Sequence, residues 1–206
     1  MSEDRWIVLL GAGGHARACI DVIERHGFYR VAGLAGLEHE RGGNILGYPV
    51  LGGDTDLPEL LAKYGTGIVT LGQIKSHEPR KRLYALLEHH ACVPPVIVSP
   101  LAYVSSHATI GPGSIVMHGA IVNAGARVGR NCIINTMALV EHDSVVEDHC
   151  HISTGARING AVTIGEGSFV GSGAVVRQGV SIGLSSVIGM GASVSEDCPI
   201  GTFVSN

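Results

Sequence analysis

The chain of 206 residues has little charge, few aromatic side chains and no long apolar segment. Only 16% of its residues are charged, the net charge is −4 and no basic tract is present, which argues against nucleic acid and anionic membranes as partners. The longest apolar stretch, "ACVPPVIVSPLAYVSS", is broken by prolines, and the start "MSEDRW" is too polar for a secretory signal. The five cysteines form no recognisable framework, so free thiols are expected. These features predict a cytoplasmic protein.

Glycine, in contrast, is abundant: 30 residues, beside only 4% aromatics, indicate a repetitive backbone. A period of six begins after residue 100, and it matches neither a heptad nor a helical repeat. Every position of the series is valine or isoleucine: Val104, Ile110, Val116, Val122, Val128, Ile134, Val140, Val146, Ile152, Ile158, Ile164, Val170, Val176, Ile182, Ile188, Val194 and Ile200.

The position two residues before each of these is mostly small, as at Ala120, Ala126 and Cys132. Side chains two apart in an extended chain face the same way, so each hexad points one small and one β-branched residue inward and then turns. Short strands joined by tight corners predict a solenoid whose coils stack about 4.8 Å apart. We therefore expect residues 100–206 to form one solenoid domain.

Residues 1–99 alternate between apolar strands and amphipathic helices, which predicts a small Rossmann-like α/β domain. Its turn "GAGGHA" fits a dinucleotide-binding pattern, but Ala35 and Gly36 stand where a ribose-binding acid is expected, so NAD is disfavoured. A glycine turn opening a helix still offers backbone N–H groups to a phosphate. We expect Gly13, Gly14 and His15 to contact a nucleotide-linked ligand, with a purely structural turn as the alternative.

Residues 135–154, "NTMALVEHDSVVEDHCHIST", gather three histidines and four carboxylates. A neutral imidazole can act as a general base near pH 7 when a carboxylate fixes its tautomer, and His142 has Glu141 and Asp143 on either side. Because extended neighbours point to opposite sides, only a turn at 142–143 would bring Asp143 to the ring, and which acid partners His142 stays open. If a coil holds 18 residues, His142 faces only Ala124 and Gly160 above and below.

The hexads after a small α/β domain resemble the hexapeptide-repeat acyltransferases, in particular bacterial sugar O- and N-acetyltransferases. The resemblance implies a left-handed parallel β-helix of three-hexad coils, a homotrimer, and acetyl-CoA in the groove between two subunits. It also implies that the first domain holds a sugar or nucleotide-sugar.

On "INTMALVEHD" the resemblance places the catalytic base at His142, its orienting acid at Asp143 and a substrate-side polar residue at Asn135. It further assigns His151 to acetyl-CoA, His15 to the nucleotide-sugar, and Gly72 to the glycine that the family keeps after the third strand. Gly171 and Gly189, one coil apart, suit a pantetheine arm, and Arg177 suits a CoA phosphate. The paired aspartates of many N-acetylating relatives are replaced here by Ala35 and Gly36.

The remaining histidines are expected to be structural. His149 is expected at the surface or at a trimer interface, His107 and His118 in solvent, and His151 is expected to point outward from its strand. A zinc site, as in solenoid carbonic anhydrases, is the rival interpretation of the cluster, but the histidines occupy different hexad positions, so no metal is predicted. Cys132, Cys150 and Cys198 occupy the small inward position and are expected in the core.

The function hypothesis is an acetyl-CoA-dependent acetyltransferase that acts on the amino group of a nucleotide-linked amino-deoxy sugar for surface glycan synthesis. Two alternatives are an O-acetyltransferase of a sialic-acid-like sugar and a non-catalytic trimeric binding module. The sequence fixes neither the sugar nor its nucleotide.

Overall fold

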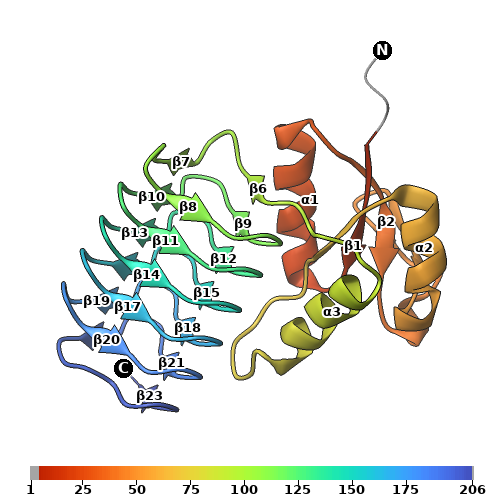
Figure 1. The fold of residues 1–206 in the computed structure, drawn as a ribbon. Helices are drawn as coiled ribbons and strands as arrows, with labels where there is room; N and C mark the ends of the chain where they lie inside the picture. The colour runs from red at the N-terminus through yellow and green to blue at the C-terminus, as the bar shows by residue number, and fades with distance from the viewer. Residues whose placement is uncertain (1–4, 206) are drawn as a thin grey trace.

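The computed structural model describes residues 5–205. Its N-terminal part is a five-stranded sheet with helices on both faces (Figure 1). The strand order is β3-β4-β2-β1-β5, parallel except for the β3–β4 hairpin. Its elements are β1 Trp6–Leu10, α1 Gly14–His26, β2 Arg30–Ala35, the 3₁₀ turn η1 Glu38–Glu40, β3 Asn44–Ile45, β4 Tyr48–Gly52, the 3₁₀ turn η2 Asp54–Asp56, α2 Leu57–Tyr64, β5 Gly67–Val69 and α3 Glu78–His89.

Local sequence explains where α1 begins and ends. Gly13 is its N-cap without a side-chain hydrogen bond, and no acid lies in the first turn, so the N-terminal N–H groups stay available. The helix ends at Gly27, whose φ of 73° is the left-handed conformation that glycine adopts without steric cost. The expected strand, glycine turn and helix are therefore all present.

The remaining strands form a solenoid of three parallel sheets. The first sheet, against which the α/β unit packs, is called the docked sheet. It contains β6 Ile97–Val98, β9 Ile115–Val116, β12 Ile133–Ile134, β15 His151–Ile152, β18 Phe169–Val170, β21 Val187–Ile188 and β23 Phe203–Val204. The second sheet contains β7 Tyr103–Val104, β10 Ile121–Val122, β13 Leu139–Val140, β16 Arg157–Ile158, β19 Val175–Val176 and β22 Ser193–Val194. The third sheet contains β8 Thr109–Ile110, β11 Arg127–Val128, β14 Val145–Val146, β17 Thr163–Ile164 and β20 Ser181–Ile182.

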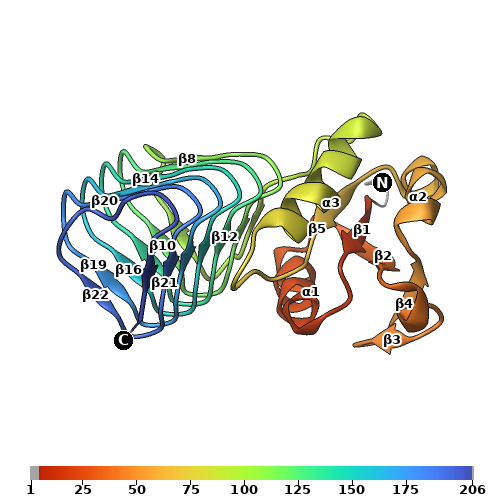
Figure 2. The same cartoon turned by 90° about the horizontal axis from the view of Figure 1, so that it is seen from below.

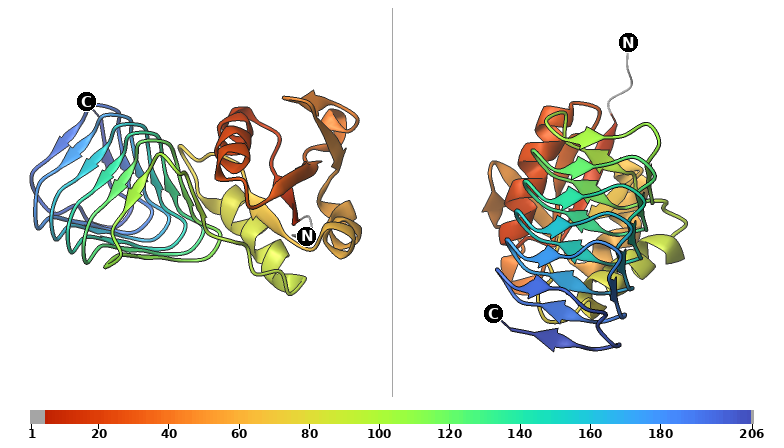
Figure 3. Two further views of the ribbon diagram at one scale, coloured as in Figure 1. Left: turned by 90° about the horizontal axis from the view of Figure 1, so that it is seen from above. Right: turned by 90° about the vertical axis from the view of Figure 1, so that its left-hand side faces the viewer.

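Each coil from β6 to β20 takes one strand from each sheet, and the coils stack in chain order (Figure 3). After β22 the period of six is lost, and Ile200, expected to point inward, is exposed in a turn. The pairing of Val122 with Val140, and of Val140 with Ile158, confirms the expected repeat of 18 residues. The inward valines, isoleucines and small residues form one buried core along the solenoid axis. Cys132 and Cys150 are buried in that core, as their inward positions predict, whereas Cys198, near the end of the solenoid, is only partly buried.

The α/β unit lies against the docked sheet, with α1 between the solenoid and the α/β sheet and α2 on the far side (Figures 1 and 2). Outward side chains of the docked sheet, such as Ile115 and Ile133, share a buried cluster with Ile20 and Ile23 of α1. The solenoid and the α/β unit therefore have a continuous apolar core between them.

Polar contacts add to this junction at Arg80 of α3, which is fully buried. Its Nη2 donates to the backbone oxygen of Asn131 at 2.6 Å, and its Nη1 donates to Oε1 of Gln73 at 3.1 Å. Gln73 in turn donates through Nε2 to the backbone oxygen of Gly167 at 2.9 Å. These bonds tie α3 and the loop that follows β5 to two coils.

Among residues 5–205, no helix combines the length and the apolar character needed to cross a membrane.

Candidate functional site

The corner between β13 and β14 carries His142. Asp143 adopts a φ of 60°, a left-handed conformation that aspartate tolerates better than most residues. This turn brings the Asp143 carboxylate back to the ring, where His142 Nδ1 lies 2.9 Å from Oδ2. Glu141 is used differently, because its Oε2 accepts the backbone N–H of His142 at 3.2 Å and Nδ2 of Asn123 at 2.8 Å. Asp143, not Glu141, is the acid that contacts the imidazole.

The ring lies over Gly160, one of its two small neighbours one coil away, and Ala124 is the other. A Cβ added to Gly160 would lie 2.6 Å from Nε2 of His142, so the ring occupies space that any larger residue would fill. The side chain of His142 is 54% exposed. With Nδ1–H donating to Asp143, Nε2 carries the lone pair and can accept a proton from a substrate.

A cavity of about 380 Å³ lies where the α/β unit meets the docked sheet, and both parts contribute to its walls. Nδ1 of His151 donates to the backbone oxygen of Gln73 at 2.8 Å, and Nε2 accepts from Nδ2 of Asn135 at 3.1 Å. Predicted site residues line much of this cavity: Gly13, Gly14, His15, Gly72, Asn135 and His151.

His151 does point out of its coil, but it is only 6% exposed because the α/β unit covers it. Burial, with smaller contributions from His15 and Arg80, lowers its pKa to about 3. His15 lines the same cavity, and burial, followed by the charge of Arg80, lowers its pKa to about 4. Its buried Nε2 makes no hydrogen bond to any described residue.

Two of the structural histidines depart from expectation. His149 is only 3% exposed, packs edge-on against the Tyr84 ring and accepts from Nδ2 of Asn131 at 2.9 Å. The expectation of a surface or interface role was wrong because α3 covers that corner. His118 is not in open solvent either, since its Nε2 pairs with Asp21 of α1 at 2.8 Å. His107 is exposed as expected.

A second cavity, about 360 Å³ in volume, opens at the carboxyl ends of β1, β2 and β5. Its walls come from the glycine turn at Gly11–Gly13, from 35–37, and from α3 on the opposite side. Gly13 and Leu71 line both cavities, so the glycine turn stands between them. In open α/β sheets, ligands bind at this end of the strands, and the free N–H groups of α1 favour a phosphate there.

One carboxylate in this cavity was missed by the sequence analysis. Glu40 follows β2 by five residues, and its Oε2 accepts the backbone N–H of Leu37 at 2.7 Å. A Cβ on Gly36 would lie 2.7 Å from that oxygen, so the carboxylate lies over the end of the strand. Leu37 has no side-chain acceptor, so only the Glu40 half of a capping box is present, and the sequence carried no clear signal for it.

Of the four residues predicted for the cofactor, His151 lies in the junction cavity and the other three lie on two edges of the solenoid. Gly171 and Gly189 stack closely at the corner between the docked and second sheets, where a Cβ on Gly171 would lie 2.5 Å from the backbone nitrogen of Met190. Arg177 is exposed at the corner between the second and third sheets, on the same edge as His142. One chain does not bring these three residues together.

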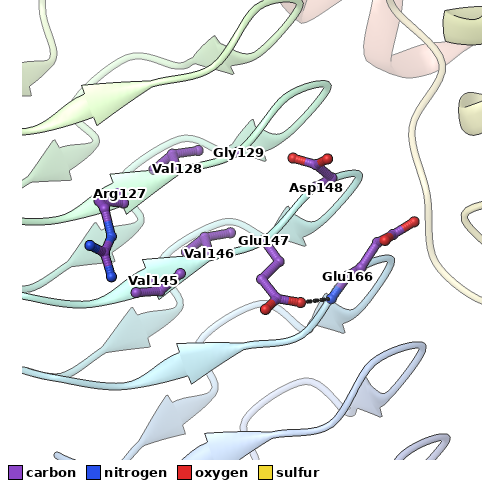
Figure 4. A pocket seen from close by; sticks show the side chains of 8 residues that line it. All are labelled: Arg127, Val128, Gly129, Val145, Val146, Glu147, Asp148 and Glu166. Atoms are coloured by element: carbon purple, nitrogen blue, oxygen red, sulfur yellow. Dashed lines mark hydrogen bonds between the residues drawn. The ribbon is translucent and has the colours of Figure 1, made fainter.

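The other two acids of the cluster, Glu147 and Asp148, lie away from the His142 corner. A shallow cavity of about 310 Å³ on the third sheet is lined by Arg127, Glu147, Asp148 and Glu166 (Figure 4). Glu147 accepts the backbone N–H of Glu166 at 2.9 Å, and Glu166 pairs with Lys81 of α3 at 2.8 Å. Within 5–205, no group of three or more His, Cys, Asp or Glu side chains is placed to hold a metal ion.

Comparisons with known proteins agree with this architecture. Residues 6–86 match the family described as the PglD N-terminal domain. Residues 143–178 match the bacterial transferase hexapeptide (six repeats), and 161–196 match the hexapeptide repeat of succinyl-transferase. Among curated protein sequences, none matches the chain.

Solved structures resemble the whole chain. The acetyltransferase domain of PglB from Neisseria gonorrhoeae FA1090, in complex with acetyl coenzyme A, is 32% identical with a TM-score of 0.90, over 99% of this chain and 97% of that one. PerB from Caulobacter crescentus, in complex with CoA and GDP-perosamine, is 32% identical with a TM-score of 0.89, over 97% and 93%. WeeI from Acinetobacter baumannii AYE, 24% identical with a TM-score of 0.85, covers 96% and 94% and supports the fold.

Proposed function

We propose that this chain catalyses a reaction centred on His142. The chain belongs to the hexapeptide-repeat sugar acetyltransferases, with a PglD-type N-terminal domain and a left-handed β-helix. The enzyme is an acetyl-CoA-dependent N-acetyltransferase of an amino sugar, as its relatives support. The sugar is linked to a nucleotide, and surface glycan synthesis is the destination that such a product fits. Residues 1–99 bind the nucleotide-sugar and residues 100–206 carry the acyl transfer.

The observation that carries this proposal is the exposed His142–Asp143 pair, with Nδ1 bound to Asp143 at 2.9 Å. The sugar amine attacks the thioester carbonyl of acetyl-CoA, and Nε2 of His142 removes the proton that the nitrogen loses. Asp143 stabilises the imidazolium that forms, and the thiolate of CoA leaves and takes up a proton. Amide formation and thioester cleavage then balance without a further reactant.

The acceptor has room on either side of the glycine turn. PerB holds GDP-perosamine together with CoA, which supports a nucleotide-sugar here. We place the nucleotide in the cavity at the strand ends, its phosphates at Gly13 and Gly14, and the sugar toward His15, Gly72 and Asn135. The unpartnered Nε2 of His15 and the absence of acids from the first turn of α1 support this direction.

The site needs a second copy of the chain. The α/β unit covers the docked sheet, whereas His142 lies on the edge between the two other sheets. Within one chain, the sugar-side cavity and the general base are therefore on different sides of the solenoid. A homotrimer would bring the base of one subunit to the sugar of another, with CoA in the groove that they share. In that groove, Gly171 and Gly189 on one subunit's edge and Arg177 on another's would meet the same cofactor.

The test is the release of CoA thiol from acetyl-CoA with a panel of UDP- and GDP-linked amino sugars as acceptors. His142→Ala is expected to lower the rate by roughly 10²- to 10⁴-fold, as the loss of a general base does. His107→Ala, which removes an exposed corner histidine on the same edge, is the matched control and should keep full activity. A loss under about tenfold for His142→Ala would remove His142 from the mechanism. Acetylation of a hydroxyl instead of an amine would refute the acceptor assignment.

A further inference from the structure

Glu40 has the geometry of a ligand group that the proposed chemistry does not yet use. Its Oε2 accepts the N–H of Leu37 at 2.7 Å, while its backbone N–H donates to the carbonyl of Leu37 at 2.8 Å. Its backbone oxygen accepts the N–H of Gly43 at 2.9 Å. The residue is therefore fixed at three points, and its carboxylate is preorganised before any ligand arrives.

The second carboxylate oxygen is available. No hydrogen bond joins Oε1 of Glu40 to any residue in 5–205, although the side chain lines the cavity at the strand ends. The nearby guanidinium of Arg41 is engaged elsewhere, with Glu38 at 2.9 Å and Asp56 at 2.6 Å. Glu40 thus keeps an acceptor and a negative charge that no described side chain neutralises.

The position of the Glu40 carboxylate indicates which part of a nucleotide it would contact. The carboxylate stands over Gly36 at the end of β2, and Ala12 of the glycine turn is the next neighbour, with its Cβ 3.0 Å from a Cβ placed on Gly36. In nucleotide-binding α/β folds, a carboxylate at the end of the second strand accepts the ribose hydroxyls while the phosphates lie on the glycine turn. Because Ala35 and Gly36 have no polar side chain, Glu40 reaches this place from the following 3₁₀ turn.

We propose that Glu40 binds the ribose diol of the acceptor nucleotide, so that the enzyme selects ribonucleotide-linked sugars over 2′-deoxyribonucleotide-linked ones. This inference rests on the proposed function, since it assumes that the acceptor is a nucleotide-sugar. It does not depend on the base, because uridine and guanosine diphosphates present the same diol.

The experiment measures binding of UDP, 2′-deoxy-UDP, GDP and 2′-deoxy-GDP by calorimetry to the wild-type protein. A hydrogen bond to a charged acceptor predicts that the preferred ribonucleotide binds roughly ten- to a hundredfold more tightly than its deoxy partner. In Glu40→Ala the ratio should fall close to one, and in Glu40→Gln it should fall to an intermediate value. Glu38→Ala is the matched control, because Glu38 belongs to the same turn but lines neither cavity, and its ratio should match that of wild type.

The outcomes separate two failures. A wild-type ratio near one, or a preference that persists in Glu40→Ala, overturns the role of Glu40 while nucleotide binding itself still supports the proposed function. If none of the four nucleotides binds and no nucleotide-linked sugar is acetylated, the nucleotide acceptor is wrong and the assignment of Glu40 falls with it. The comparison of ribonucleotide with deoxyribonucleotide binding to the wild-type protein needs no variant. The proposal can therefore be refuted even if the Glu40→Ala protein does not fold.

Discussion

Gly160 shows how a single hydrogen atom in place of a side chain shapes the proposed reaction centre. A Cβ at this position would meet Nε2 of His142 at 2.6 Å, and the exposed imidazole is the group able to move away. We expect Gly160→Ala to lower kcat by about 10²-fold through a misplaced base, while the free energy of unfolding changes by less than about 1 kcal/mol. Kinetics and urea denaturation of the same variant check this. Unchanged kcat, or a free energy of unfolding that falls by clearly more than this, would contradict the prediction.

The residue scale also shows what the sequence could and could not predict. His142 stood out as a candidate base because its neighbours are acids and its stacked partners, Ala124 and Gly160, are the smallest residues, and its role stays a prediction. The partner acid was not, since the left-handed φ of Asp143 decides it. His151 pointed outward as alternation predicts, but alternation does not say what covers the outer face, and Gln73 comes from 78 residues away. The burial of His149 under α3 escaped prediction for the same reason.

At the scale of elements, each two-residue strand of the solenoid has one side chain that points outward and one that points into the core. In β16, Ile158 is fully buried in the axial core, while Arg157 is exposed on the outside. Ile158→Ala should lower the free energy of unfolding by about 2 to 5 kcal/mol, because the stacked coils cannot collapse into the cavity. Arg157→Ala, one residue away, should change it by less than about 0.5 kcal/mol. Chemical denaturation of both variants measures the difference, and similar values would contradict the inward ladder.

The elements that sequence predicted best are those with the strongest period. Sixteen of the seventeen positions, Val104 to Val194, lie in the predicted strands, and the pairing of β10, β13 and β16 confirms the 18-residue repeat. The expectation for Ile200 was wrong, because the period ends after Val194 and Val204 instead pairs with Ile188. The β3–β4 hairpin was missed. Its turn places Leu46 at a φ of 52° and Gly47 at a φ of 93°. A Leu-Gly pair does not indicate a hairpin turn, whereas an Asn-Gly pair would. The Asn44 side chain stabilises the turn instead by accepting the N–H of Gly47 at 2.8 Å.

At the scale of the whole molecule, the α/β unit and the solenoid are joined through buried histidines. His15, His149 and His151 all lie at this junction, and burial is the first cause that lowers each pKa, to about 4, about 4 and about 3. In the unfolded chain the same imidazoles have their ordinary value of 6.5. Below that value the unfolded state binds protons that the folded state refuses, so the junction is expected to lose stability as the pH falls.

This gives a prediction with a definite sign and range. Each of the three histidines leaves stability unaffected above about pH 7 and lowers it by about 1 kcal/mol at about pH 5.5, where unfolded imidazole is largely protonated and the buried ring stays neutral. Urea denaturation at the two pH values should therefore show a loss of about 3 to 4 kcal/mol in wild type. His149→Gln, which retains an acceptor for Asn131 but does not titrate, should reduce that loss by about a third. His107→Gln, at an exposed corner, is the control and should leave it unchanged. A wild-type stability that does not change between these pH values would mean that water reaches the junction and that the two parts are less tightly packed than their shared core requires.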